Sequence, residues 1–289
     1  SRSVFDHRAV VVAGGVEALS AVAAGAESAR VAVGVARPAG QVAFVFPGQG
    51  SQWLGMGVEL AEVSPVFRAS LDACAEALAP YVDWSLHDVL RDAAELERVD
   101  VVQPALFAVM VSLAALWRSF GVEPDAVVGH SQGEIAAAHV AGALSLEDAA
   151  RVVALRSQAI LALSGQGGMV SLAVTVEAAR ERIARWDGRI SVAAVNGPGS
   201  VVVAGDADAL DELMESCAAD EVRARRVPVD YASHSPHVER IRGALAEVLA
   251  GVEPLPASVP MFSTVSGEWL TGTEVGAEYW YQNLRNTVR

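Results

Sequence analysis

Short apolar runs, typical of buried strands, alternate along the chain with longer stretches that have the 3.6-residue spacing of helices. Residues 41–46 and 126–128 are two such runs. Between about residues 52 and 165 the chain is mostly helical in character, apart from the strand at 126–128. After a further helix, another strand is expected at 259–265. This alternation of buried strands and helices predicts an α/β fold.

The spacing of the expected strands and helices changes after Gly167 and Gly168, where shorter elements follow one another closely. Their order is strand, helix, strand, strand, helix, strand, which is the split βαβ or ferredoxin-like unit. The expected strands are 169–175, 189–195, 200–204 and 222–229, and the expected helices are 176–185 and 206–219. We therefore predict a small subdomain at 167–229, inserted into a larger one formed by 41–166 and 230–289.

The first forty residues have their own pattern. A strand is expected at 9–14, a helix at 16–24 and a second strand at 31–35. Pro38, Ala39 and Gly40 then interrupt regular secondary structure. This segment is interpreted as a linker or as the edge of a neighbouring domain.

Charge and hydropathy restrict the classes of partner. The net charge of −14 opposes binding to nucleic acid or to an anionic membrane over most of the surface. No apolar run reaches the roughly 18 residues that span a bilayer. The first residues have no signal-peptide pattern, so a cytoplasmic location is expected.

Cys74 and Cys217 are far apart and are interpreted as reduced structural thiols, with no metal site or disulfide.

The clearest chemical signal is Gly129-His130-Ser131-Gln132-Gly133, between an apolar run and a helix-like segment. Strand, G-x-S-x-G and helix together are the context of a nucleophile elbow, which exposes a serine hydroxyl at the end of a strand. The first amides of the helix then lie close enough to stabilise an oxyanion. The alternative is an ordinary tight turn in which the serine caps the helix.

A nucleophilic serine needs a base, and His234 is the best placed of six histidines. It lies where the chain returns from the small subdomain, and such junctions form clefts. The alternative is that His234 caps the following helix, and His237 is the second candidate for the base. Asp230 could complete a Ser-His-Asp set, but it lies only four residues before His234, which makes the geometry unconvincing. A main-chain carbonyl could orient the imidazole equally well.

The helix expected from Ser145 to Leu163 begins with a capping box formed by Ser145 and Asp148. Projection at 100° per residue places Arg156 in the middle of its apolar face. A buried guanidinium must find an anion or lose several kcal/mol of solvation. Two readings remain open: an ion pair with a core Asp or Glu, or a two-pronged bond to a substrate carboxylate.

Several motifs occur in an order that resembles one family, the acyltransferase domains of modular type I polyketide synthases, which are related to malonyl-CoA:acyl carrier protein transacylases. The resemblance covers about residues 41–289, and the first forty residues look like the end of the ketosynthase-to-acyltransferase linker. The motifs are Phe46 to Gln52, Gln103 to Leu106, Gly129 to Gly133, Leu155 to Ser157, Asn196 to Pro198, Tyr231 to His234 and Tyr279 to Arg285.

This resemblance implies an α/β-hydrolase-like large subdomain with a ferredoxin-like small one, and a Ser131–His234 dyad that requires no acid. The resemblance also implies roles for other residues: backbone amides of Gln49 and Gln132 would form the oxyanion hole, Arg156 would bind a free carboxylate, the carbonyl of Asn283 would orient the histidine, and Gln103, His130 and Asn196 would line the pocket.

Three features resemble the methylmalonyl-selective members: the sequence from Tyr231 to His234, Gln132 after the nucleophile, and the stretch from Arg98 to Gln103. Ser233, where malonyl-selective members have phenylalanine, leaves room for a branch methyl. One methyl is worth only about 1–3 kcal/mol, so malonyl and ethylmalonyl remain alternatives.

The implied partners are methylmalonyl-CoA, the phosphopantetheine arm of an acyl carrier protein and an adjacent ketosynthase domain, with no permanently bound cofactor. Arg223, Arg225 and Arg226 form the densest basic cluster, interpreted as a solvated strand edge or as a contact for these anionic partners. A serine hydrolase or thioesterase, and a non-catalytic docking domain, are the rival functions.

Overall fold

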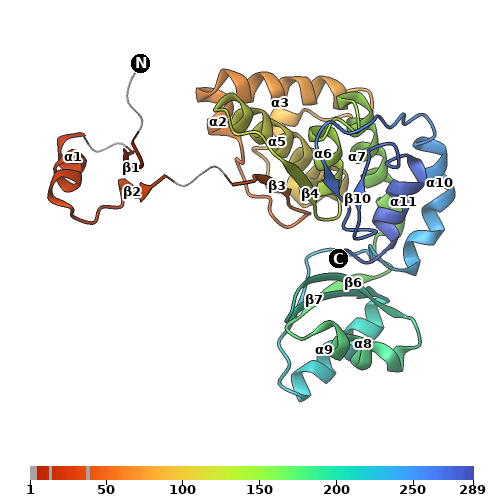
Figure 1. The fold of residues 1–289 in the computed structure, drawn as a ribbon. Helices are drawn as coiled ribbons and strands as arrows, with labels where there is room; N and C mark the ends of the chain where they lie inside the picture. The colour runs from red at the N-terminus through yellow and green to blue at the C-terminus, as the bar shows by residue number, and fades with distance from the viewer. Residues whose placement is uncertain (1–4, 13–14, 37–39) are drawn as a thin grey trace. The chain divides into compact units, whose positions relative to one another are not determined.

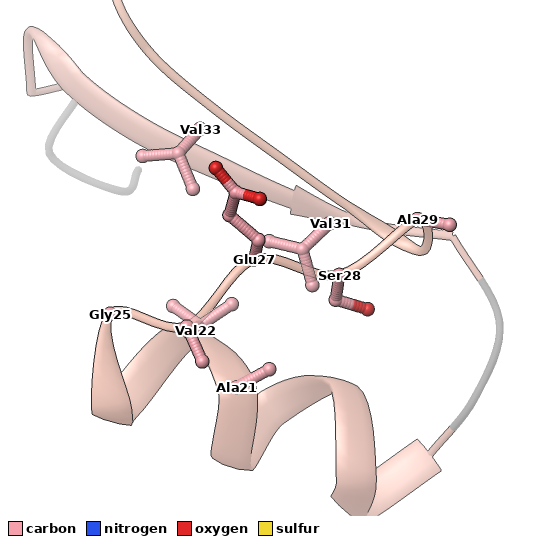
Figure 2. Close-up of a pocket in the computed structure, with 9 residues that line it drawn as sticks. Ala21, Val22, Gly25, Glu27, Ser28, Ala29, Val31 and Val33 are labelled. Atoms are coloured by element: carbon pink, nitrogen blue, oxygen red, sulfur yellow. The ribbon is translucent and has the colours of Figure 1, made fainter.

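The computed structural model describes residues 5–12, 15–36 and 40–289, which belong to two compact units, residues 1–41 and 42–289. In the first unit, β1 (His7–Val11) pairs antiparallel with β2 (Val31–Val35), and α1 (Gly15–Ala24) connects them. The strand expected at 9–14 thus begins two residues earlier, and its last two positions lie outside the described residues. A hollow of about 700 Å³ lies between α1 and β2, where Val22, Val31 and Val33 line it (Figure 2).

The second unit contains a four-stranded sheet in the order β10-β9-β4-β3 (Figure 1). Its strands are β3 (Ala43–Phe46), β4 (Ala126–Gly129), β9 (Met261–Phe262) and β10 (Trp269–Leu270). β3, β4 and β9 are parallel, and β10 is antiparallel to β9. The register pairs Phe46 with Gly129, so the carboxyl ends of the first two strands meet at one edge. Ligands bind at this edge of an open parallel sheet.

The strand expected at 259–265 is much shorter in the structure. β9 ends at Phe262 because the next two residues turn their hydroxyls to polar partners in the interior. Ser263 Oγ lies 2.7 Å from the Tyr279 hydroxyl, and Thr264 Oγ1 donates to Glu134 at 2.7 Å. Side-chain hydrogen bonds of this kind compete with a strand ladder.

Helices surround this sheet and share one apolar core (Figure 1). They are α2 (Val58–Val63), α3 (Pro65–Leu78), α4 (Leu86–Val89), α5 (Val99–Ser119), α6 (Gly133–Val140), α7 (Leu146–Ile160), α10 (Arg242–Val248) and α11 (Ala277–Arg285). Short 3-10 helices occupy 95–97, 161–163, 184–186 and 236–241. The predicted cap of α7 is present, since Asp148 N donates to Ser145 Oγ at 3.0 Å.

α5 corrects the expectation that no segment is long and apolar enough to cross a bilayer. Its 21 residues include an 18-residue window with a mean hydropathy of 1.9. Asp100, Gln103 and Ser112 interrupt the apolar run without lowering this average enough to exclude a span. Because 83% of that window is buried inside the protein, α5 has the burial of a core helix.

A second sheet has the strand order β6-β7-β5-β8, and all its pairings are antiparallel. Its elements are β5 (Gly168–Leu172), α8 (Val176–Ile183), β6 (Ile190–Gly197), β7 (Ser200–Gly205), α9 (Ala207–Ala219) and β8 (Ala224–Arg226). The element order is the predicted β-α-β-β-α-β, and α8 and α9 cover one face of the sheet (Figure 1). The predicted α/β fold class is confirmed.

The second sheet has its own apolar core, and main-chain bonds tie it to the end of the chain. Val170 and Val203 are buried in that core beside the two helices. The Val195 N–H donates to the Val288 carbonyl at 2.9 Å, and the Thr287 hydroxyl donates to the Val192 carbonyl at 2.7 Å. Cys74 and Cys217 are buried free thiols in the two different cores.

Candidate active site

Ser131 lies in a sharp turn between β4 and α6, and its φ of 53° is in the left-handed region. Two glycines allow the turn because the backbone packs closely on both sides. A Cβ on Gly129 would clash with the backbone of Gly133 and Glu134, and a Cβ on Gly133 would clash with the carbonyl of Phe46. The predicted strand, tight turn and helix are therefore all present, and they lift the serine side chain off the sheet edge.

The Ser131 hydroxyl lies 2.8 Å from Nε2 of His234. The other ring nitrogen, Nδ1, is 2.7 Å from the Asn286 carbonyl, which can only accept a hydrogen bond. Nδ1 therefore carries the proton and Nε2 is free to accept one from the serine. Burial, and then the charge of Arg156, lower the pKa of His234 to about 3, so the ring is neutral at pH 7.

The carbonyl that orients His234 corrects one expectation from the sequence. It belongs to Asn286, three residues after the expected Asn283. Asn286 is the first residue beyond α11 and has extended backbone, so its carbonyl is free of the helix ladder. The Asn286 carbonyl raises the pKa of His234 against the lowering effect of burial, and the backbone of Asn283 raises it to a smaller extent.

The alternatives left open by the sequence have other partners in the structure. α6 has no side-chain cap bond, and the helix after His234 is capped by Ser235, whose Oγ accepts from the His237 N–H. His237 itself pairs with Asp206 at 2.7 Å. Asp230 accepts hydrogen bonds from Ser164 and from the Gly165 N–H, so it does not form a triad with Ser131.

A cavity of about 230 Å³ opens beside the Ser131–His234 pair. It brings together most of the side chains that the sequence singled out, contributed by segments around both four-stranded sheets. These are Gln49, Gln103, His130, Ser131, Gln132, Asn196, Tyr231, Ser233 and His234. Larger hollows lie elsewhere: one in the first unit, one of about 480 Å³ beside β3 and α5, and one of about 310 Å³ lined by residues between 83 and 98. Neither Ser131 nor His234 lines any of the three.

One wall of the cavity was missed by the sequence reading. It is formed by the face of the second sheet that α8 and α9 leave uncovered, and it is apolar. Its residues include Met169, Ala194, Val202 and Val227. Met169 and Val202 alternate with Val170 and Val203, which face the helices. Apolar residues at both odd and even positions of a strand indicate that both of its faces are covered.

Arg156 is fully buried, as the helix projection predicted, and it is not among the residues that line the cavity. Its Nη1 donates to Gln103 Oε1 at 3.1 Å and its Nη2 donates to Asn283 Oδ1 at 2.9 Å. In the described part of the chain no carboxylate lies within salt-bridge distance, and Nε has no partner. Burial lowers the pKa of Arg156 to about 10, so the guanidinium is still charged at pH 7.

Polar side chains connect Arg156 to the rim of the cavity. Gln103 Nε2 donates to Gln49 Oε1 at 3.1 Å, and the Tyr231 hydroxyl donates to the same oxygen at 2.9 Å. Burial raises the pKa of Tyr231 to about 12, which keeps this donor protonated. These bonds fix the two glutamine side chains beside the nucleophile.

Potential donors remain free around Ser131. Across residues 5–12, 15–36 and 40–289, no acceptor is found for the backbone N–H of Gln49 or of Gln132. Both residues line the cavity, where an oxyanion hole is expected. The Gln132 side-chain amide is buried and also lacks a partner among those residues. His130 Nε2 lies 3.0 Å from Asn196 Oδ1, at the junction of the subdomains.

Other candidate binding features are weaker. The described residues contain no group of His, Cys, Asp and Glu arranged to hold a metal ion. In the basic cluster, Arg226 pairs with Asp211, while Arg223 and Arg225 line a separate hollow of about 220 Å³.

Comparison with known proteins agrees with this geometry. Residues 43–289 match the acyl transferase domain family. The chain is 60% identical over 306 residues to the polyketide synthase GfsE of Streptomyces halstedii, a match that covers 100% of this chain and 8% of that relative. The chain thus spans a small part of the relatives that it matches.

Two solved structures extend the comparison to the fold. The acyltransferase domain from module 8 of the salinomycin polyketide synthase has 59% identity and a TM-score of 0.93, covering 100% of this chain and 70% of that one. The malonyl CoA-acyl carrier protein transacylase from Coxiella burnetii has 29% identity and a TM-score of 0.79, covering 86% and 80%. The chain therefore belongs to the acyl transferase domain family and is an acyltransferase domain like those of modular polyketide synthases.

Proposed function

We propose that this domain transfers a methylmalonyl extender unit from methylmalonyl-CoA to the phosphopantetheine thiol of an acyl carrier protein, through an ester on Ser131. The proposal is carried by one observation: Gln103 lines the cavity of the serine–histidine pair and accepts from a buried, charged guanidinium, for which the described residues provide no carboxylate partner. Such an arginine suits an acyl group that brings its own carboxylate.

In the first half-reaction the Ser131 oxygen attacks the thioester carbon as its proton moves to Nε2 of His234. The carbonyl oxygen becomes an oxyanion, and the N–H groups of Gln49 and Gln132 are the donors proposed to stabilise it. When the tetrahedral intermediate collapses, the carbon–sulfur bond breaks and the proton on His234 passes to the departing CoA sulfur. The acyl group remains as an ester on the serine.

The second half-reaction repeats these steps with a thiol as the nucleophile. His234 takes the proton from the phosphopantetheine thiol, the sulfur attacks the ester carbon, and the proton returns to the Ser131 oxygen as that bond breaks. No metal or redox group takes part in either half. An acyl carrier protein, an adjacent ketosynthase domain and a cytoplasmic location belong to this same proposal.

The choice of acyl group is the finest part of the proposal. Ser233 and Tyr231 line the cavity, and the small side chain at 233 leaves space for a branch methyl. Gln132 lies at the nucleophile itself and presents an unpaired amide. These side chains support methylmalonyl over malonyl, while ethylmalonyl would need more space at the same position.

A competition experiment tests the choice of acyl group. The domain is mixed with equal concentrations of methylmalonyl-CoA and malonyl-CoA and a phosphopantetheinylated carrier protein, and the acylated carrier protein is analysed by mass. We expect mainly methylmalonyl-carrier protein. An excess of malonyl product would refute the assigned selectivity, and free acid without acylated carrier protein would support a hydrolase.

A further inference from the structure

Glu134, the second residue of α6, is a fully buried acid that the proposed mechanism does not use. Its carboxylate accepts four hydrogen bonds, from donors on two other segments of the large subdomain. The Thr264 N–H and hydroxyl donate to Oε1 at 2.5 and 2.7 Å, and the Tyr279 hydroxyl and Asn283 Nδ2 donate to Oε2 at 2.7 and 2.9 Å. Hydrogen bonds donated to a carboxylate favour its ionised form.

Asn283 connects this carboxylate to the active site. Its Nδ2 also donates to the Ser131 carbonyl at 3.2 Å, so both neighbours on that side of the amide are acceptors. The amide is therefore turned so that Oδ1 faces Arg156 and accepts from Nη2 at 2.9 Å. An ionised carboxylate and a main-chain carbonyl can only accept hydrogen bonds, so Glu134 and the Ser131 carbonyl together hold the amide in this orientation.

We propose that Glu134 is a positioning residue for carboxyacyl recognition, which acts through Asn283 to orient the guanidinium of Arg156 and to supply its countercharge from a distance. The inference rests on the proposed role of Arg156 and extends it to a residue that does not touch the substrate. A carboxylate in direct contact with Arg156 could occupy two of its N–H groups at once through a bidentate pair. The single oxygen of Asn283 takes one N–H of Nη2 and leaves the second one for another acceptor.

The charges are consistent with this arrangement. Desolvation lowers the pKa of Arg156, whereas the charge of Glu134 acts in the opposite direction and favours the charged guanidinium. Burial raises the pKa of Glu134 above its ordinary value, and hydrogen bonds from Tyr279, Thr264 and Asn283 oppose that rise. The four donors that face its two oxygens are the geometric reason for assigning the ionised form.

The substitution Glu134→Gln tests the inference with almost no change in shape. The Thr264 N–H still needs an acceptor, so the new amide places its oxygen there and its NH₂ toward Asn283. Asn283 then either keeps its Nδ2 against this NH₂, or turns its oxygen to it and sets Nδ2 against the Nη2 of Arg156. Either arrangement places donor against donor and disturbs the amide that holds Arg156. We expect kcat/KM for acylation by methylmalonyl-CoA to fall at least about tenfold more than for propionyl-CoA, mainly through KM.

Three further variants complete the test. Tyr279→Phe removes one of the four donors and keeps the carboxylate, so a smaller loss in the same direction is expected if Glu134→Gln does not fold. Glu177→Gln, an exposed acid on α8, is the matched control and should leave both rates unchanged. Arg156→Ala should lose methylmalonyl transfer selectively.

The outcomes separate the inference from the proposed function. The positioning role alone would be overturned if kcat/KM fell equally for methylmalonyl-CoA and propionyl-CoA in Glu134→Gln and Tyr279→Phe, while Arg156→Ala lost activity selectively with methylmalonyl-CoA. If kcat/KM fell equally for the two thioesters in Arg156→Ala, the proposed binding of the substrate carboxylate by Arg156, on which the inference rests, would be overturned. Selective losses in all three variants, against an unchanged Glu177→Gln control, are the result we expect.

Discussion

Ser131 and His234 hydrogen-bond at 2.8 Å, and both have left-handed backbone, with φ values of 53° and 59°. Non-glycine residues in this region cost of order 1–3 kcal/mol each and persist where the surrounding structure fixes them. Here the glycines of the turn fix the serine, and the His234 N–H donates to the Leu284 carbonyl at 2.8 Å. The two strained residues meet at the point where the chemistry is proposed.

The strain at Ser131 can be measured by comparing two inactive variants. Ser131→Gly and Ser131→Ala both remove the hydroxyl and its bond to His234, but glycine adopts positive φ without a steric cost. We expect the glycine variant to be more stable by about 1 kcal/mol in denaturant unfolding. A more stable alanine variant would show that the turn carries no such strain.

The close approach at Gly133 predicts a large effect of a single methyl group. Gly133→Ala would push a Cβ into the Phe46 and Pro47 carbonyls, so we expect a loss of about 3 kcal/mol or of folded protein altogether. Gly243, on exposed α10, has open space around its Cα and is the matched control. Gly243→Ala should be neutral or stabilising by up to about 1 kcal/mol, and equal losses in the two variants would contradict the packing argument.

The buried His234 predicts an unusual pH dependence of acylation. Its pKa of about 3 keeps the ring neutral well below pH 6.5, whereas an ordinary histidine would be about nine-tenths protonated at pH 5.5. The single-turnover acylation rate at pH 5.5 should therefore stay within about twofold of its value at pH 7.5. A tenfold fall would indicate an ordinary pKa for the base.

The same pKa has a consequence for stability. The unfolded chain binds a proton at this histidine below pH 6.5 and the folded one does not until about pH 3. The contribution of His234 to folding is therefore complete above pH 6.5 and is lost as the pH falls toward 3. Unfolding curves at each pH are needed so that loss of folded protein is not mistaken for loss of rate.

Ser233 predicts a change of acyl selectivity. Its side chain lines the cavity and is nearly buried, so Ser233→Phe would occupy the space assigned to the branch methyl. In competition, the ratio of methylmalonyl to malonyl product should fall about tenfold or more, with the rate for malonyl-CoA retained. An unchanged ratio would place the methyl group elsewhere in the cavity.

Local patterns were enough to predict the elements around Ser131 and the burial of Arg156, because turn glycines and helical spacing are encoded over a few residues. The order of elements in the second sheet was predicted for the same reason. Tertiary contacts decided the rest. Nothing near Asn286 indicates that its carbonyl meets His234, and β9 is short because Thr264 turns to a carboxylate 130 residues away in the sequence.

Whether Ser131 carries the acyl group can be measured as the intact-protein mass after a rapid quench. On mixing with methylmalonyl-CoA, we expect a single methylmalonyl adduct, mapped to Ser131 by peptide analysis and absent from Ser131→Ala. No adduct at any quench time in folded protein, or an equal adduct on Ser131→Ala, would contradict the account.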